Sequence, residues 1–552
     1  MRLVLFIVLV PVLLIGQPPI DRYQTELFGV TESNDVQFST GVPQPNSGGG
    51  FYEWITGLPL NVEEYNTSAM DLQMDIFEPT GDTLQKRPLV IVCFGGGFLS
   101  GSKDHWSIRL ICQELAKRGY VAAAIDYRLG MNIFDSDLAN RAVYRGLQDA
   151  RSAVRFFRAD AANANAYKID PDHIFIGGHS SGAFMALHNA YLDKEIERPI
   201  STYEWVQDGQ FIPDQECLDC VGDNTGFSGH ANAIFSLAGA LGFTSFIENA
   251  FDPKAVMFHS TDDGTVPYNS GGPFSSIIWA VIGSDLPTVY GSLPISQQAD
   301  AVGLPYDFFS YTNRGHDVHE ESSSDLYSDI IPGICEWFFE EELKPTHKSL
   351  FGDTTVCTNE LTKTYTLDSG DGIYFDWNVV GGTPIDLTTA SNQITVIWNE
   401  LEPEHLLSVT PYNQMDAKGD LIQLEISINP HDENIFLHQN NNWSDPSNWS
   451  LNHIPTVCED VTINTIEIPF DIMMSEKAEI NSLKVESGIS LIVNQEFLIH
   501  QKNTSVIIHA LELAGNLTNN SILTIANNYA SDEIKIEESG SLTNNGDLRL
   551  KN

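Results

Sequence analysis

The stretch "IGGHSSGAF", at residues 176–184, constrains the fold of this chain more than any other segment. The β-branched and aromatic run "HIFI" leads into it, and the helix-like run "AFMALHNAY" overlaps its end. Gly178, Ser180 and Gly182 fit the pattern G-x-S-x-G, in which a serine stands on a sharp turn between a strand and a helix. Glycine is needed at both ends because a Cβ there would collide with neighbouring backbone. The stretch therefore predicts a strand–turn–helix joint that exposes the hydroxyl of Ser180.

The chain before residue 345 alternates between two kinds of segment. The runs "RPLVIVCF" and "VAAAIDY" are typical of buried strands. Residues 106–120 and 141–161 repeat apolar residues at helical spacing, so that each has one apolar face. This alternation predicts an α/β fold built on a doubly wound, mostly parallel sheet with helices on both faces.

Backbone amides suited to binding an oxyanion are expected in two places. "CFGGGFLSG" follows a predicted strand, and the absence of side chains at Gly96 and Gly97 allows close approach to a substrate carbonyl. Ser181 begins the predicted helix, so its amide points a donor and the positive end of the helix dipole at the same place. We expect the amides of Gly96, Gly97 and Ser181 to form an oxyanion hole beside Ser180.

An acid and a base are expected at two later strand ends. "AVMFHSTDDGTVPY" is a strand that ends in acidic residues, and "YDFFSYTNRGHDVH" is a strand followed by a turn with His316. Asp263 stands three residues before Val266, where a carboxylate can orient a histidine, and its neighbour Asp262 is the competing candidate. The chain order Ser180, Asp263, His316 is that of α/β-hydrolases and differs from that of trypsin-like or subtilisin-like enzymes.

These segments give the chain a family resemblance. Residues from about 20 to 345 resemble secreted carboxylesterases of the α/β-hydrolase superfamily, in the group that includes feruloyl-, acetyl- and hormone-sensitive-lipase-like esterases. The resemblance is carried by "LQMDIFEPTGDTLQKRPLVIVCFGGGFLSG", "GYVAAAIDYRLG", "DARSAVRFFRADAANANAYKIDPDHIFIGGHSSGA", "HSTDDGTVPY" and "NRGH". It implies an α/β-hydrolase catalytic domain at 17–345, with Ser180 as nucleophile, His316 as general base and Asp263 as its partner. Such enzymes usually have histidine before the three glycines, where this chain has Phe94.

The resemblance and the residue order predict a secreted serine esterase that works through an acyl-enzyme. This chemistry needs no metal and no organic cofactor. The expected partner is a small-molecule ester or an ester carried on a polysaccharide. The formal net charge of −45, from 29 Lys+Arg and 74 Asp+Glu, argues against nucleic acid or an anionic membrane as partner. Two alternatives stay open: an exported serine peptidase of the same fold, and a catalytically inert adhesin or binding protein.

Two insertions are expected to shape the substrate pocket, because both should rise from the carboxyl ends of the strands. One spans residues 190–230, and the other follows the acidic strand end. Phe274 and Trp279 of the second insertion, together with Phe94, are candidate substrate contacts. The alternative for the insertion's aromatic residues is that they pack its own small core.

The amino-terminus indicates export, and export in turn favours a disulfide between two of the cysteines. Residues 1–16 combine a basic residue, an apolar run and a small residue, which is the pattern of a signal peptide. No later segment is apolar enough to span a bilayer, so we expect an extracellular or cell-surface protein, with the periplasm as the alternative. Cys217 and Cys220 form C-x-x-C in a polar loop. A zinc site would need two more ligands at suitable spacing, so a loop disulfide is expected.

The chain after residue 345 has the pattern of all-β modules. Residues 346–430 resemble an Ig-like or PKD-like β-sandwich. The second cysteine that such modules often carry near their end is missing, so Cys357 is expected to be free. Residues 431–552 contain a repeat, "GNLTNNSILTI" at 515 and "GSLTNNGDLRL" at 540, which predicts a short β-solenoid. In the same segment Trp443 and Trp449 either stack on sugar rings or are buried.

Overall fold

The structure is a computed structural model, and it describes residues 21–207, 209–274, 285–320, 325–347, 349–464, 471–501, 511–513, 516–519, 522–527, 534–536 and 541–551. The predicted signal peptide at 1–16 and the predicted substrate contact Trp279 lie outside the described residues. The chain divides into two compact units. The first ends at Lys344 and also includes Asn413–Lys418, and the second comprises Pro345–Tyr412 and the chain from Gly419. Among the described residues, no helix is long and apolar enough to cross a membrane.

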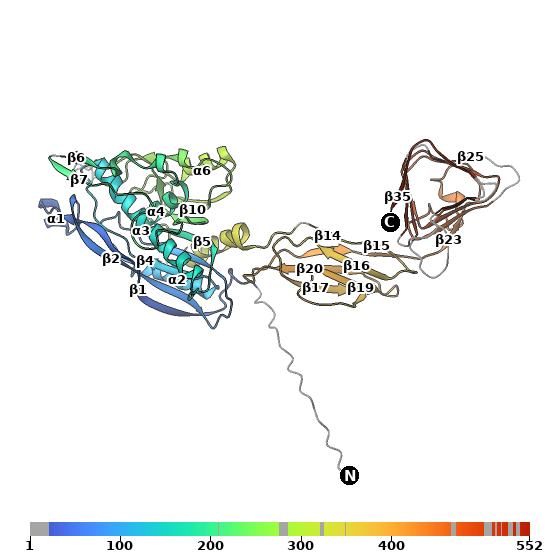
Figure 1. The fold of residues 1–552 in the computed structure, drawn as a ribbon, viewed down its shortest axis with the longest axis horizontal. Coiled ribbons are helices and arrows are strands. Elements are labelled where there is room, and N and C mark those ends of the chain that lie inside the picture. Colours follow the sequence, from blue (N-terminus) through green and yellow to red (C-terminus); the bar gives the residue numbers. More distant parts are fainter. Residues whose placement is uncertain are drawn as a thin grey trace, which may run out of the picture. The chain divides into compact units, whose positions relative to one another are not determined.

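The centre of the first unit is a sheet of eight strands, all in the described part of the chain, in the order β1-β2-β4-β3-β5-β8-β10-β13. Figure 1 labels five of them, β1, β2, β4, β5 and β10. β1 pairs antiparallel with β2, and β2 with β4, while the other pairings are parallel. The prediction of a mostly parallel sheet is therefore confirmed. The strands are β1 (Gly29–Ser47), β2 (Val62–Thr80), β3 (Arg87–Cys93), β4 (Val121–Ile125), β5 (Ile169–His179), β8 (Ala233–Leu237), β10 (Lys254–Ser260) and β13 (Tyr306–Tyr311).

Helices cover both faces of this sheet because of the order in which the chain visits the strands. Crossovers between parallel strands are right-handed, so a reversal of direction across the sheet puts the next helix on the opposite face. The chain moves one way from β3 to β4 through α2, and the other way from β4 to β5 and β8 through α3 and α4. Accordingly α3 packs against α4, and α2 packs against α8. The helices are α2 (Trp106–Lys117), α3 (Ser136–Ala162), α4 (Ser181–Tyr191), α6 (Ser292–Val302) and α8 (Ile331–Phe338).

Short elements complete the described part of the first unit. They are α1 (Phe51–Thr56), η1 (Glu195–Glu197), η2 (Ile200–Thr202), β6 (Trp205–Gln207), β7 (Gln210–Ile212), β9 (Ala240–Leu241), η3 (Thr244–Phe246), β11 (Ser270–Gly271), β12 (Val289–Gly291), η4 (Leu326–Ile330) and η5 (Phe339–Leu343). β9, β11 and β12 form a small antiparallel sheet, and β6 pairs with β7.

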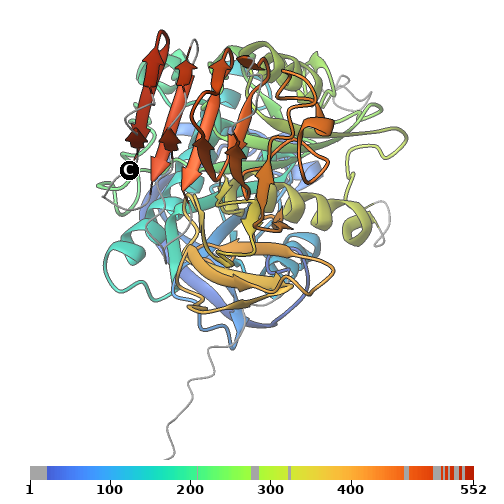
Figure 2. The same cartoon turned by 90° about the vertical axis from the view of Figure 1, so that its right-hand side faces the viewer.

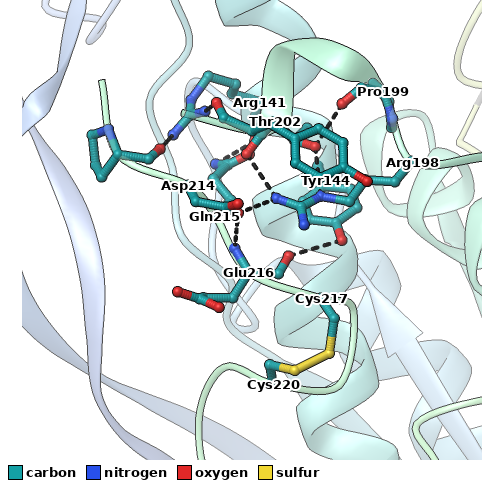
Figure 3. Close-up of polar contacts among 12 residues, drawn as sticks. Arg141, Tyr144, Arg198, Pro199, Thr202, Asp214, Gln215, Glu216, Cys217 and Cys220 are labelled. Atoms are coloured by element: carbon teal, nitrogen blue, oxygen red, sulfur yellow. Dashed lines mark hydrogen bonds and ion pairs between the residues drawn. A yellow bond between two sulfur atoms is a disulfide. The ribbon is translucent and has the colours of Figure 1, made fainter. Parts of the chain in front are cut away.

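The insertion after α4 is fastened to α3 by buried polar side chains (Figure 3). From α3, Arg141 donates to the carbonyl of Pro213 at 2.6 Å, and the hydroxyl of Tyr144 donates to the carbonyl of Glu216 at 3.1 Å. The guanidinium of Arg198, within the insertion, lies 5.4 Å from the centroid of the Tyr144 ring. These contacts hold the insertion against α3. Its Leu192 and Pro199 line a cavity of about 700 Å³, its opening included, together with Phe184 and Phe246. No described residue of the insertion lines the two cavities beside Ser180, so the expectation that it shapes the pocket at the serine is not met.

The second unit begins with small sheets around an aromatic core. Among its described residues, β14-β16-β19-β18 form one antiparallel sheet and β17-β20-β21 another, and β15 pairs parallel with β22. Tyr365, Trp377 and Trp398 are buried in one cluster with the alternate apolar residues of these strands. The strands are β14 (Leu350–Phe351), β15 (Thr355–Cys357), β16 (Thr362–Leu367), β17 (Tyr374–Val380), β18 (Gly382–Pro384), β19 (Gln393–Trp398), β20 (Leu406–Tyr412), β21 (Ile422–Glu425) and β22 (Ser427–Asn429).

The described residues from Glu433 onwards form parallel sheets, whose strands lie side by side in Figure 2. Equivalent residues stack from one turn of the chain to the next: Leu491 pairs with Leu517, and Leu517 with Leu542. The side-chain amide of Asn519 donates to that of Asn544 at 2.7 Å. The strands are β23 (Glu433–Ile435), β24 (Asp460–Ile463), β25 (Asp471–Met474), β26 (Ala478–Ile480), β27 (Ser482–Val485), β28 (Ser490–Val493), β29 (Phe497–Gln501), β30 (Leu511–Leu513), β31 (Asn516–Asn519), β32 (Ile522–Asn527), β33 (Ile534–Ile536), β34 (Ser541–Asn544) and β35 (Asp547–Lys551), with the turn η6 (Pro446–Asn448).

The two tryptophans that had a sugar-stacking alternative are buried. Trp443 and Trp449 are 1% and 0% exposed, and their ring centroids lie 4.7 Å apart. The indole N–H of Trp449 donates to the carbonyl of Trp443 at 2.8 Å. With no face open to a ligand, these rings act as core side chains of the second unit.

All seven cysteines lie within the described residues. Cys217 and Cys220 form the disulfide expected from their spacing (Figure 3). Cys357 was expected to be free, and that prediction is wrong because Cys357 is bonded to Cys458. The partner lies 101 residues further along the chain, beyond the module in which it was sought. The remaining thiols are buried: Cys93, Cys112 and Cys335.

Candidate active site

Ser180 stands where β5 meets α4, in a backbone conformation that residues other than glycine rarely adopt. Its φ is 53° and its ψ is −118°. The turn is tightly packed, since an added Cβ would come within 2.3 Å of the carbonyl oxygen of Cys93 at Gly178 and within 2.2 Å at Gly182. The predicted need for glycine on both sides of the serine thus has a direct steric cause. The strained turn is held by a buried strand and a buried helix.

His316 and Asp263 meet Ser180 at the carboxyl edge of the sheet. His316 Nε2 lies 2.9 Å from Ser180 Oγ, and His316 Nδ1 lies 2.8 Å from Asp263 Oδ2. The Asp263 side chain is fully buried, whereas that of His316 is 16% exposed. Because parallel strands end at one edge, the sheet brings together residues 136 positions apart. The three side chains are linked in the order acid, base and nucleophile that acyl transfer uses.

Asp263 is held by four hydrogen-bond donors. Its Oδ1 accepts from the amides of Thr265 at 2.8 Å and Val266 at 2.9 Å. Its Oδ2 lies 3.2 Å from Nε2 of the buried His259, besides the contact with His316. Burial alone would raise the pKa of Asp263, but hydrogen bonds from His259 and His316 outweigh it and hold the pKa well below its ordinary value. Asp263 is therefore ionised at neutral pH and accepts a hydrogen bond from His316 Nδ1.

Asp262, the competing candidate, has a different environment. Its Oδ1 accepts from the hydroxyl of Ser260 at 2.5 Å and from the amide of Gly315 at 3.3 Å. Hydrogen bonding to the Ser260 hydroxyl lowers the pKa of this exposed carboxyl. Asp262 thus supports the turn before His316 and makes no hydrogen bond to its ring, whereas Asp263 does.

The predicted oxyanion-hole amides lie beside Ser180, but they are not equivalent. No described residue accepts a hydrogen bond from the amide of Gly96 or from that of Ser181, at the start of α4. The amide of Gly97 instead donates to Ser181 Oγ at 3.1 Å, so it is engaged within the protein. Gly96 has a φ of 132°, and a Cβ there would lie 2.0 Å from the carbonyl oxygen of Ser100. Two amides are thus left for an oxyanion in this conformation.

An apolar pocket of about 470 Å³, its open mouth included, lies on one side of Ser180. Phe274 is among its lining residues, at the place expected for a substrate contact. Phe94 is not: it is 1% exposed and stacks on Tyr127 with ring centroids 4.2 Å apart. The prediction that Phe94 contacts substrate is wrong, because the residue after β3 turns into the core. The described lining is Gly97, Phe98, Met131, Ala139, Val143, Ser180, Ser181, Phe184, Val266, Pro273, Phe274, Leu286, Pro287 and Val289.

A polar cleft of about 830 Å³, counted with its opening, lies on the other side of Ser180. His105, His179, Asp317 and Glu320 line it together with the glycine loop. Burial, aided by two neighbouring histidines, lowers the pKa of His179 well below its ordinary value, so this ring is neutral. One group of described residues has ligand atoms close enough together to hold a metal ion: His179, His316 and Asp317. Within it, both ring nitrogens of His316 are engaged in hydrogen bonds with Ser180 and Asp263.

Two residues beside the site were missed by sequence reasoning. His259 lies on β10 four residues before Asp263, and its Nδ1 faces Ser292 Oγ at 3.0 Å. Tyr127 follows β4, and its hydroxyl reaches the glycine loop. The sequence does show both as a polar ring in, or just after, an otherwise apolar strand. Each also lies close to a predicted site residue, either along the chain or on a neighbouring strand.

The doubly wound sheet, the strained serine and the order of strand-end residues define the first unit as an α/β-hydrolase fold. Residues 74–223 match the family model described as BD-FAE, which is a carboxylesterase family of α/β-hydrolases. This match indicates a carboxylic ester hydrolase, so the prediction of an enzyme of that class is confirmed. No curated protein matches the chain.

The chain is also similar to solved structures of an esterase from the Planctomycetes species Thermogutta terrifontis. The native form of that esterase is 21% identical, with 50% of this chain and 89% of that chain covered and a TM-score of 0.36. The propionate-bound form is 22% identical, with 50% and 90% covered and a TM-score of 0.36. The butyrate-bound form is 21% identical, with 50% and 92% covered and a TM-score of 0.35.

Proposed function

We propose that this protein is an exported serine esterase in which Ser180 is the nucleophile, His316 the general base and Asp263 the residue that orients it. The proposal rests on one observation above all: the continuous hydrogen-bond chain from Asp263 through His316 to a serine on a strained turn. A buried structural serine would need neither the strained backbone nor a histidine held by an ionised carboxylate.

The acylation step follows from the positions of the atoms. His316 Nε2 takes the hydroxyl proton as Ser180 Oγ attacks the carbonyl carbon of the ester. The developing oxyanion accepts hydrogen bonds from the amides of Gly96 and Ser181, each worth roughly a hundred- to a thousandfold in rate. When the intermediate collapses, the C–O bond to the alcohol breaks and the alcohol leaves with the proton held by His316.

Deacylation uses the same groups in reverse. His316 removes a proton from water, whose oxygen attacks the acyl carbon bound to Ser180. The acid leaves, and Ser180 Oγ regains its proton from His316. Asp263 remains ionised throughout, because four donors stabilise its charged form, and it stabilises the imidazolium that forms in both steps.

The two cavities beside Ser180 support a substrate with two unlike halves. The apolar pocket suits a short hydrocarbon acyl group, and Phe98, Phe184 and Val289 are among its walls. The polar cleft, with Asp317 and Glu320 at its edge, suits an alcohol that carries further hydroxyl groups. We therefore place an acylated carbohydrate, free or within a polysaccharide, as the substrate class.

Export and the role of the tail belong to the same proposal. The signal-peptide pattern at residues 1–16 supports secretion, and so do disulfides at Cys217–Cys220 and Cys357–Cys458, since such bonds form in oxidising compartments. We assign the second unit to a β-sandwich followed by a short β-solenoid. The antiparallel sheets and the parallel stacked strands support this assignment.

The test is a substrate panel with the purified full chain and its Ser180→Ala variant. We expect hydrolysis of nitrophenyl acetate and butyrate, and release of acid from acetylated xylan or feruloylated sugars. The Ser180→Ala variant should melt at the same temperature and lose at least a thousandfold in turnover. A nitroanilide peptide panel tests the peptidase alternative. Turnover retained by Ser180→Ala, or a wild-type protein inert on every ester, would overturn the proposal.

A further inference from the structure

A line of hydrogen bonds joins the two ends of the glycine loop through the hydroxyls of Ser181 and Tyr127. The hydroxyl of Tyr127 lies 3.0 Å from the carbonyl oxygen of Phe94 and 3.0 Å from Ser181 Oγ. Ser181 Oγ in turn lies 3.1 Å from the amide nitrogen of Gly97. Tyr127 and Ser181 are 1% and 2% exposed, so water does not compete for these groups. The line begins and ends on the same loop, at the residues that flank Gly95 and Gly96.

The direction of each hydrogen bond is determined by its two ends. The carbonyl of Phe94 can only accept, so the single proton of the Tyr127 hydroxyl points at it. Ser181 must then donate its own proton to the oxygen of Tyr127. The remaining acceptor position of Ser181 Oγ receives the N–H of Gly97. The protons therefore all run one way, from Gly97 to Ser181 to Tyr127 to Phe94, and bonds aligned in this way strengthen one another.

We propose that Tyr127 and the hydroxyl of Ser181 are positioning residues that hold the oxyanion hole in its working shape. This inference rests on the proposed esterase function. The backbone amide of Ser181 would contact the oxyanion, whereas its side chain and Tyr127 act only through the loop. By tying both ends of the Gly95–Gly96 segment to the start of α4, the line sets the Gly96 amide relative to the Ser181 amide. An oxyanion hole that is already formed costs no reorganisation in the transition state.

The hydrogen bond from the Gly97 amide to Ser181 Oγ has a role in this arrangement. That amide is one end of the line, so it serves to anchor the loop and is not a third oxyanion donor. Removal of the Ser181 hydroxyl would free that amide but would release the loop from α4. These two effects have opposite signs, since a third free donor would raise kcat and a released loop would lower it. We expect the loss of position to dominate.

The test compares Tyr127→Phe, Ser181→Ala and the double variant with matched controls in the full chain. Tyr120→Phe removes a hydroxyl that is equally buried but has no hydrogen-bond partner among the described residues. Ser152→Ala does the same for a serine. We expect each single test variant to lower kcat about tenfold, the value of one good hydrogen bond, with KM within twofold. The inhibition constant of a boronic acid that forms a tetrahedral adduct should rise about tenfold, and both controls should match the wild type.

The double variant tests whether the two hydroxyls act as one unit. Because the line works as one unit, Tyr127→Phe/Ser181→Ala should lose about as much as either single variant, not the hundredfold that independent effects would give. Test variants that behave like the Tyr120→Phe and Ser152→Ala controls would overturn the inference, and so would additive losses or a rise in kcat for Ser181→Ala. These outcomes are separate from a failure of the proposed function, which would appear as turnover that survives Ser180→Ala.

Discussion

Replacing Asp263 by asparagine should move the proton on His316 to the wrong nitrogen. The amides of Thr265 and Val266 both donate to Oδ1, at 2.8 and 2.9 Å. In Asp263→Asn the side-chain oxygen must take the Oδ1 position, because those two amides need an acceptor. The NH₂ group then replaces Oδ2, 2.8 Å from His316 Nδ1. An NH₂ group donates, so Nδ1 must accept and the ring proton must sit on Nε2.

The magnitude follows from what Nε2 can no longer do. A protonated Nε2 cannot accept the hydroxyl proton of Ser180, and loss of the base by this tautomer change costs about 10⁴ in kcat, or about 5 kcal/mol. The introduced NH₂ also faces Nε2 of His259, which donates in the native protein. Two opposed donors in a fully buried place should lower the free energy of unfolding by roughly 1–3 kcal/mol.

The assay is kcat/KM on nitrophenyl acetate, with thermal melting to show that each variant folds. Asp262→Asn is the matched control: it lies one position away and bonds the hydroxyl of Ser260 and the amide of Gly315. We expect that variant to stay within about fivefold of the wild type, since its carboxyl makes no hydrogen bond to His316. A folded Asp263→Asn variant with more than a tenth of wild-type turnover, or the reverse ranking of the two variants, would refute the reasoning.

Three further predictions concern other parts of the chain. Burial lowers the pKa of His188 from its ordinary 6.5 to about 4, so the unfolded chain binds a proton there first. The free energy of unfolding should fall by up to about 3 kcal/mol as the pH drops from 6.5 to 4. In the His188→Gln variant, the free energy of unfolding measured by urea denaturation should vary less over that pH range. Phe184 lines both the apolar pocket beside Ser180 and the cavity that Leu192 and Phe246 line, so Phe184→Ala should join the two and raise kcat/KM for octanoate relative to acetate esters at least tenfold. Cys357→Ser/Cys458→Ser opens a loop of 101 residues and should cost the second unit roughly 3–5 kcal/mol in denaturant melts.

The residues that meet in the candidate site were predictable because each has a local signature. Ser180 lies between two glycines at the joint of a strand and a helix, and Asp263 and His316 each follow an apolar strand. The sheet topology then brings these residues together, since the carboxyl ends of parallel strands lie at one edge whatever their separation in sequence. The choice of Asp263 over Asp262 was also accessible, because adjacent residues at a strand end point in different directions.

The errors arose where a side chain's fate depends on a distant partner. Phe94 follows a buried strand, and nothing local shows that its ring stacks on Tyr127. Cys357 was judged by its own module, while its partner is Cys458. The loop Asn413–Lys418 lies within the tail in sequence but belongs to the first unit, where Tyr23 donates to the carbonyl of Met415. Periodicity reports which face of a segment is apolar and cannot name the segment that covers it.

The glycine loop combines two demands that oppose each other. A carbonyl can approach Gly95 and Gly96 closely because neither has a side chain, and there is no room for one: an added Cβ would lie 2.6 Å from His179 Nδ1 at Gly95 and 2.0 Å from the carbonyl oxygen of Ser100 at Gly96. Glycine also has the most conformational freedom to lose, so such a loop resists being held in one shape. An oxyanion hole acts only if its donors are already in place. Hydrogen bonds must therefore supply the rigidity. Within the loop, the amides of Leu99 and Ser100 donate to the carbonyl of Gly96. From outside the loop, the hydroxyls of Tyr127 and Ser181 are in position to hold its two ends.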